Sequence, residues 1–152
     1  MEILNTTPDR EITVQRILNF PIELVYKAFE EPNHLKNWWG PKGFTNTFHT
    51  FEFMPGGKWI FTMHGPDKGN YKNECNFIIV EKNKLLVWDH YVNPKFYVIV
   101  QFKEIAKSKT ELTFKQLFDS VELRDKIKKY TKGKNEENFD RLENELSKMK
   151  GK

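Results

Sequence analysis

The chain has 152 residues, a formal net charge of +4 and a mean hydropathy of −0.69. This length fits one domain, and we expect a single domain over residues 1–152 with its core at about 11–149. Apolar runs are far shorter than the roughly 20 residues of a membrane span, and the N-terminus lacks the pattern of a secretory signal. The single cysteine, Cys75, excludes an internal disulfide and suits a reducing compartment. We therefore expect a cytoplasmic protein that makes no membrane contact.

The positive charge gathers in one run near the C-terminal end. Five lysines fall within nine residues without an acid: Lys126, Lys128, Lys129, Lys132 and Lys134. Such a run suits an acidic partner, but a solvated helix end accounts for it better. The chain has no zinc-finger spacing, arginine cluster or aromatic RNA-binding motif. We expect no nucleic-acid partner.

The first elements in the chain are one strand and two short helices. Residues 11–18 alternate imperfectly between apolar and polar side chains, which predicts a strand at or near a sheet edge. Residues 20–30 have apolar side chains on one helical face, with Pro21 in the first turn and Glu31-Pro32 as the stop. A second short helix follows, which we expect Asn33 to cap and Gly40-Pro41 to end.

The pattern then changes to strands separated by short turns. Six apolar segments alternate with turns rich in Gly, Pro, Asn and Lys, which predicts an antiparallel meander; the strands cover about 44–53, 58–64, 71–80, 85–92, 96–105 and 110–118. Helical periodicity returns at residues 121–130 and 135–149. In the second of these segments Phe139, Leu142, Leu146 and Met149 form one apolar stripe.

This order predicts an α+β fold. An antiparallel sheet of seven strands with one apolar face must bury that face, and the long C-terminal helix is the available cover. A curved sheet around a single helix leaves space that side chains fill only in part. We therefore expect a cavity between the sheet and the helix.

Three segments carry a resemblance to a known family. They read P-I-E-L-V-Y-K-A-F from Pro21, H-L-K-N-W-W-G-P from His34, and F-E-F-M-P-G-G-K-W-I-F-T-M-H-G-P-D from Phe51. Together they resemble the SRPBCC or START-like superfamily and, within it, proteins related to the C-terminal domain of the activator of the 90-kDa heat-shock protein ATPase. Arg124-Asp125 and the F-D-R-L segment from Phe139 fit the same pattern, so that the resemblance covers roughly residues 12–146.

The resemblance implies a helix-grip fold, in which a curved seven-stranded antiparallel sheet wraps a long C-terminal helix and two short helices lie between strands 1 and 2. It implies no shared reaction, because members of the superfamily include chaperone co-factors, lipid carriers and polyketide cyclases. The chain departs from the family pattern at two positions. Met54 stands where relatives often have a basic residue, and Asn138-Phe139 stands where many have Gly-Trp.

The predicted cavity supplies the candidate binding residues. Trp59, Phe61 and Met63 share one strand face, which the resemblance directs toward the helix; as core residues they would need no ligand, and both interpretations stay open. Of the adjacent tryptophans, we expect one to pack under the sheet rim and the other to border the pocket. The candidate pocket residues are Trp38, Trp39, Phe51, Phe53, Trp59, Phe61, Met63, Tyr71, Phe77, Trp88, Val98, Val100, Phe114, Phe139 and Leu142.

Candidates for catalysis are weak. The four histidines are scattered without the spacing of metal ligands, and we expect no metal, no cofactor and no catalytic residue. His90 adjoins Asp89, but neighbours in a strand face opposite sides, so these two residues do not form a dyad. Tyr71 is the remaining polar candidate. We expect Cys75 to be a buried, unreactive residue.

Three functions follow from the resemblance and the predicted cavity. The first is a module that binds a hydrophobic or aromatic small molecule. The alternative is a stress-response co-factor that stimulates the ATPase of a 90-kDa heat-shock chaperone. The third is an enzyme of the cyclase or hydrolase type that uses the same pocket. The protein is expected to be a monomer or a homodimer.

Overall fold

The computed structural model describes residues 7–131 and 133–150. A short 3-10 turn, η2 (Pro8–Arg10), precedes the first strand. The strands are β1 (Glu11–Leu18), β2 (Thr45–Phe51), β3 (Lys58–His64), β4 (Asn70–Glu81), β5 (Leu85–His90), β6 (Phe96–Ala106) and β7 (Lys109–Leu117). The helices are α1 (Ile22–Glu30), α2 (Pro32–Trp38), α3 (Val121–Thr131) and α4 (Lys134–Lys150).

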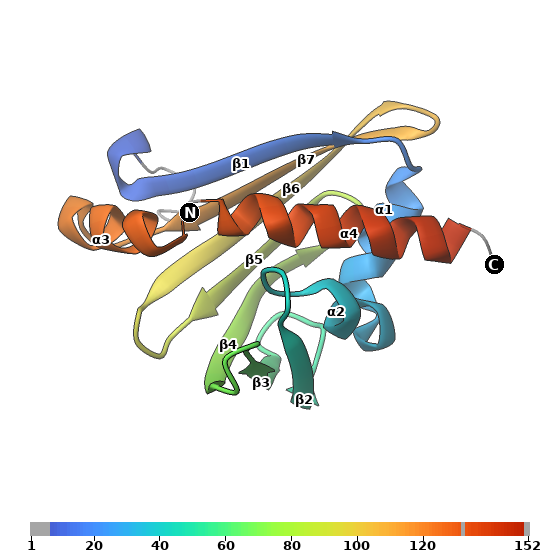
Figure 1. Cartoon of the computed structure of the whole chain (residues 1–152). Coiled ribbons are helices and arrows are strands. Elements are labelled where there is room, and N and C mark those ends of the chain that lie inside the picture. Colours follow the sequence, from blue (N-terminus) through green and yellow to red (C-terminus); the bar gives the residue numbers. More distant parts are fainter. Residues whose placement is uncertain (1–6, 132, 151–152) are drawn as a thin grey trace.

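All seven strands form one antiparallel sheet in the order β1-β7-β6-β5-β4-β3-β2. Strands β2 to β7 are a meander, and β1 pairs with β7 along its whole length, from Glu11 opposite Leu117 to Leu18 opposite Thr110. Figure 1 shows α4 crossing one face of the sheet, with α1 and α2 near one end of the helix and α3 near the other. The predicted helix-grip architecture is therefore confirmed, with β1 and β2 as the two edges.

The two short helices begin where proline permits. Pro21 directly precedes α1, and Pro32 is the first residue of α2. Because proline lacks an N–H and its φ suits the first turn, α2 begins one residue before Asn33, with Glu31 in the capping position. The prediction that Asn33 caps this helix was wrong. The backbone carbonyl of Asn33 instead accepts a hydrogen bond from the side chain of Asn37 at 2.9 Å.

Helix α4 lies with its apolar stripe on the sheet. The stripe predicted from the sequence is buried: Phe139, Leu142, Leu146 and Met149. On its outer side Arg16 of β1 donates to Asp140 at 2.9 Å and to Glu143 at 3.1 Å, which ties the edge strand to the helix. Helix α4 thus covers part of the inner face of the sheet, together with α1 and α2.

The adjacent tryptophans have different environments. Trp38 is fully buried, and its indole N–H donates to the carbonyl of Ala28 in α1 at 3.0 Å. The ring of Trp39 turns toward the sheet and contacts Trp59 and Trp88 at centroid distances of 5.3 and 5.8 Å. Trp38 therefore holds α2 against α1, while Trp39 extends the aromatic layer on the inner face of the sheet.

Candidate functional site

A cavity of about 490 Å³ lies between the sheet and the beginning of α4. Strands β3, β5, β6 and β7 supply its apolar wall, and the segment Trp39–Phe44 and helix α3 border it on two other sides. From α3 come Ile127, Tyr130 and Thr131, although no residue of this helix is buried. Helix α3 therefore covers the cavity without belonging to the core.

The wall follows from the period of two in the strands. Trp59, Phe61 and Met63 alternate along β3 and face inward, as do Phe96 and Val98 of β6. Trp59 also stacks on Phe61 at 4.4 Å. Rings from different strands meet edge to face, as Trp59 and Trp88 do at 5.5 Å, and make this wall aromatic and apolar.

The polar end of the cavity is built by the first turns of α4. Asn138 is 6% exposed, and its Oδ1 accepts the backbone N–H of Gly40 at 3.1 Å. This bond fixes the orientation of the amide, because the reverse orientation would set two donors against each other. Within residues 7–131 and 133–150, the Nδ2 group of Asn138 makes no hydrogen bond. Asn138 thus lines the cavity with two unused donor hydrogens.

The aromatic wall contains a second unused donor. Trp59 is 1% exposed, and its indole N–H has no hydrogen-bond partner in the part of the chain that the structure describes. A buried donor without a partner costs about 1–3 kcal/mol. The nitrogen itself is inaccessible to a water-sized molecule, so a ligand in the cavity would contact the ring of Trp59 and not this N–H.

His90 occupies the wall beside Asn73. Its Nδ1 lies 2.9 Å from the carbonyl oxygen of Pro94, its Nε2 lies 2.8 Å from Oδ1 of Asn73, and its ring stacks on Phe96 at 4.5 Å. Burial lowers the pKa of His90 and outweighs the opposing effect of the Pro94 carbonyl. Both ring nitrogens face oxygens, because Nδ2 of Asn73 donates to the carbonyl of Tyr71 at 3.0 Å. An imidazole with a single N–H therefore makes a hydrogen bond to only one of these two oxygens.

Cys75 also lines the cavity and is 1% exposed. Burial raises the pKa of its thiol, and the negative charges of Asp89 and Glu74 add to this effect. The side chain therefore remains a protonated, weakly polar part of the wall. This arrangement is the opposite of the electropositive surroundings that activate a cysteine nucleophile.

Arg141 anchors the segment that borders the cavity. Its Nη1 donates to the carbonyls of Gly40 and Pro41 at 2.8 and 3.0 Å, with that of Trp39 at 3.3 Å. Its Nη2 donates to the carbonyls of Asn37 and Phe44, both at 2.9 Å. A single guanidinium thus satisfies the backbone of the whole turn and fixes the position of Trp39. Because the group is partly desolvated, its pKa is lowered.

The predicted pocket residues divide into two groups. Those that line the cavity are Trp39, Trp59, Phe61, Met63, Trp88, Val98 and Phe114. Those that pack in the aromatic and aliphatic core instead are Trp38, Phe51, Phe53, Phe77, Val100, Phe139 and Leu142. The periodicity identifies the inner face of each strand, but side chains of α1, α2 and α4 pack on most of that face and leave space near the beginning of α4.

Tyr71 lies outside both groups. It is 47% exposed, and its hydroxyl donates to Asp67 at 3.2 Å within the turn between β3 and β4. Its strand position faces the same way as Phe77, but its ring lies against Phe44, with centroids 6.1 Å apart, at the hairpin end of β4. The placement of Tyr71 in the pocket is therefore wrong.

The sequence analysis did not single out several lining residues as pocket residues: Asn73, Phe96, Gln116, Asn138 and those of α3. Asn138 had a detectable signal, since it lies four residues before Leu142 on the inward face of a helix and interrupts that face with an amide. The position of α3 had no such signal, because its charged sequence does not specify what it packs against.

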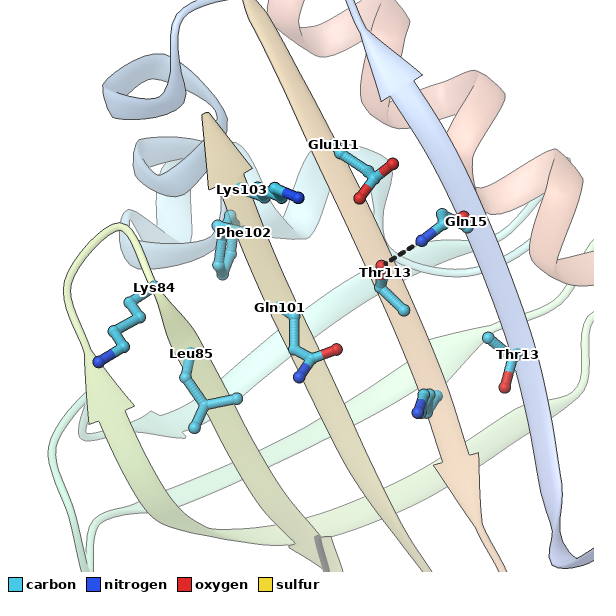
Figure 2. A pocket seen from close by; sticks show the side chains of 10 residues that line it. Thr13, Gln15, Lys84, Leu85, Gln101, Phe102, Lys103, Glu111 and Thr113 are labelled. Carbon is cyan, nitrogen blue, oxygen red and sulfur yellow. Dashed lines mark hydrogen bonds between the residues drawn. The ribbon is translucent and has the colours of Figure 1, made fainter. Parts of the chain in front are cut away.

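A second hollow, of about 570 Å³, lies on the opposite face of the sheet. Figure 2 shows polar side chains of β1, β6 and β7 around it, including the hydrogen bond from Gln15 to Thr113 at 3.0 Å. Its lining is mainly Thr, Gln and Lys. It is larger than the inner cavity, but it is a groove on the solvent face with a single aromatic residue, Phe102, and no buried unpaired donor among its described lining residues.

No group of three or more His, Cys, Asp or Glu residues among those described is placed to hold a metal ion. In the same residues, no helix has the length and apolar character needed to cross a bilayer. Lys132, one residue of the lysine run, lies outside the described residues.

Solved structures share this fold. A protein from Nitrosomonas europaea superimposes with a TM-score of 0.89 at 20% identity, over 97% of this chain and 100% of that chain. A protein from Arthrobacter aurescens gives a TM-score of 0.85 at 22% identity, over 92% of this chain and 87% of that chain. A protein of unknown function from Staphylococcus aureus gives 0.74 at 18% identity, over 93% and 96% respectively.

No curated protein matches the chain. A family model described as activator of Hsp90 ATPase homolog 1-like protein matches residues 19–147, which include every strand but the first, helices α1 to α3, and α4 up to residue 147. The chain belongs to this family of activator of Hsp90 ATPase homolog 1-like proteins.

Proposed function

We propose that the protein binds a flat hydrophobic small molecule in the cavity between the sheet and α4. The observation that carries the proposal is the combination of about 490 Å³ of space, an aromatic wall and the Nδ2 group of Asn138, which has no partner among the described residues. Small-molecule sites have volumes of about 300–1,000 Å³ and apolar walls with a few polar groups. A cavity that served packing alone would gain nothing from the unpaired amide hydrogens of Asn138.

A binding site also agrees with how the cavity is closed. Helix α3 covers it with partly exposed residues, among them Ile127, while Arg141 holds the opposite rim in place. One side is thus fixed and the other is a helix with no buried residue. This arrangement allows a molecule to enter without disrupting the core.

The test is calorimetric titration with 2-naphthalenemethanol, a neutral two-ring probe, against the wild type and two variants. Ile127→Trp places a larger ring in the cavity, and we expect it to weaken binding at least about ten-fold. Lys126→Trp adds the same ring to an exposed position of α3 that does not line the cavity, and binding should be unchanged. If the wild type binds neither this probe nor any flat aromatic compound in a thermal-shift panel, the proposal is wrong.

The family description supplies a second candidate, which is contact with a chaperone of the Hsp90 type. The groove on the outer face, lined by Lys84, Lys103 and Lys115 among polar side chains, is available for such a contact because it is separate from the cavity. The measurement is the ATPase rate of the chaperone with and without this protein. Stimulation that disappears in Lys103→Glu and persists in Ile127→Trp would favour this candidate over ligand binding.

A further inference from the structure

The polar groups of the cavity are unequally distributed. Of the titratable side chains that line it, His90 has its two ring nitrogens against the oxygens of Pro94 and Asn73, and the thiol of Cys75 is protonated. Tyr130 contributes a phenol, and Lys134 is the cation. The described lining residues include no Asp and no Glu. A molecule in this cavity therefore meets aromatic rings at one end and, at the other, donors without a compensating negative charge.

The acids near the beginning of α4 are engaged elsewhere. Glu137 accepts the backbone N–H of Lys42 at 3.2 Å, and Glu136 contacts Arg16 at 3.4 Å on the outer side of the helix. The first turn thus presents Lys134 to the cavity together with the positive end of a 17-residue helix. The positive potential of Lys134 and the helix end would not by itself define a ligand site.

Asn138 adds directed hydrogen-bond donors at this end of the cavity. Gly40 occupies its oxygen, so that only the Nδ2 hydrogens are left for the cavity, and the residue is 94% buried. Next to it Gln116 and Asn135 pair through their amides at 3.2 Å, which leaves one further amide donor whichever way the two groups are turned. An oxygen with two lone pairs and a negative charge fits these donors better than a hydroxyl does.

On the basis of the proposed function, we propose that the ligand is an aromatic carboxylic acid. Its ring system lies against Trp39, Trp59 and Trp88, and its carboxylate accepts the Nδ2 hydrogens of Asn138 with Lys134 at the mouth. The carboxylate replaces the water that would otherwise satisfy the amide. Because Lys134 is exposed, its share of the affinity decreases with added salt.

The test compares two probes with the same ring system, 2-naphthoate and 2-naphthalenemethanol, by calorimetry at pH 7.5. We expect the wild type to bind the acid at least about ten-fold more tightly than the alcohol, because hydrogen bonds to a charged acceptor are roughly twice as strong as neutral ones. Asn138→Asp keeps the acceptor for Gly40 but replaces the donor with a negative oxygen. It should weaken naphthoate binding at least about ten-fold and leave alcohol binding within about three-fold.

A second variant keeps the test independent of how Asn138→Asp folds. Lys134→Gln should weaken naphthoate binding about two- to five-fold at low salt, while Lys148→Gln, at an exposed position near the other end of α4, should have no effect. If the alcohol binds and the acid binds no more tightly, or if both substitutions leave naphthoate binding unchanged, this inference is wrong and the proposed function still stands. If neither probe binds the wild type, the proposed function itself fails.

Discussion

Replacing Arg141 tests how the rim of the cavity is held. The guanidinium donates to five backbone carbonyls between Asn37 and Phe44, at distances of 2.8–3.3 Å. Its two terminal nitrogens carry four N–H groups, so that about four full hydrogen bonds are made at once. At a net value of about 1 kcal/mol each, Arg141→Met should lower the free energy of unfolding by about 3–4 kcal/mol.

The expected loss of unfolding free energy combines a favourable and an unfavourable contribution of the guanidinium. Hydrogen bonds from a charged donor contribute about 1.5–3 kcal/mol each, which would give a larger total. Part of that is offset because burial of the guanidinium is unfavourable, as its lowered pKa indicates, and because the exposed carbonyls of the turn regain water when Arg141 is removed. Arg141→Lys should retain one or two of the bonds and lose about half as much stability.

The assay is urea unfolding followed by tryptophan fluorescence, with Lys148→Met on the exposed side of the same helix as the control. Without its anchor the turn should release Trp39, so that the emission of the folded variant shifts to longer wavelength before any unfolding. A loss below about 1 kcal/mol with an unchanged native emission spectrum would refute the reasoning, because it would mean that the turn keeps its conformation without the arginine.

Three further predictions concern the cavity. Trp39→Ala should lower the free energy of unfolding by about 3 kcal/mol, at the lower end of the range for removing a buried tryptophan because Trp39 is partly exposed. It should also weaken binding of 2-naphthalenemethanol. Unfolding and titration curves that match those of the wild type would contradict the placement of this ring. The pKa of His90 is lowered, so its contribution to stability is complete above about pH 6.5 and is lost as the pH falls, because the unfolded state then binds a proton that the folded state excludes. Between pH 7.5 and 5.5 the wild type should lose up to about 1.4 kcal/mol more stability than His90→Gln. Equal losses would show that His90 titrates normally. The raised pKa of Cys75 predicts that intact-mass measurements show no labelling by N-ethylmaleimide in native protein and complete labelling in urea, whereas rapid native labelling would mean that the thiol is accessible.

The architecture could be predicted because each of its signals is local. Alternation in β3, the turn glycines after β2 and the helical stripe that begins at Phe139 are each readable within about ten residues of sequence. The order of these elements then leaves few ways to bury one sheet face. The wrong cap assignment at Asn33 has the same origin, since two adjacent local signals competed and the proline prevailed.

The site was harder to predict because a cavity is what side chains from distant segments leave empty. Periodicity placed Trp88 and Val100 on the same face, yet only Trp88 reaches the cavity, because Val100 is fully buried within the core cluster. The role of Asn138 depends on Gly40, which is 98 residues away, and that of Arg141 depends on carbonyls that no residue type reveals. Such contacts depend on the packing of the complete chain.

The aromatic layer has a consequence for how proteins with this fold can diverge. Trp59 and Trp88 have the cavity on one side and, on the other, a closed cluster with Phe29, Phe53 and Phe77 that holds no space for water. Substitutions on the cavity side of these two rings, in α3 or the first turn of α4, change what the cavity accepts and leave the closed cluster intact. A lineage can therefore acquire a new ligand through exposed residues alone, while folding is conserved by residues that the ligand never touches.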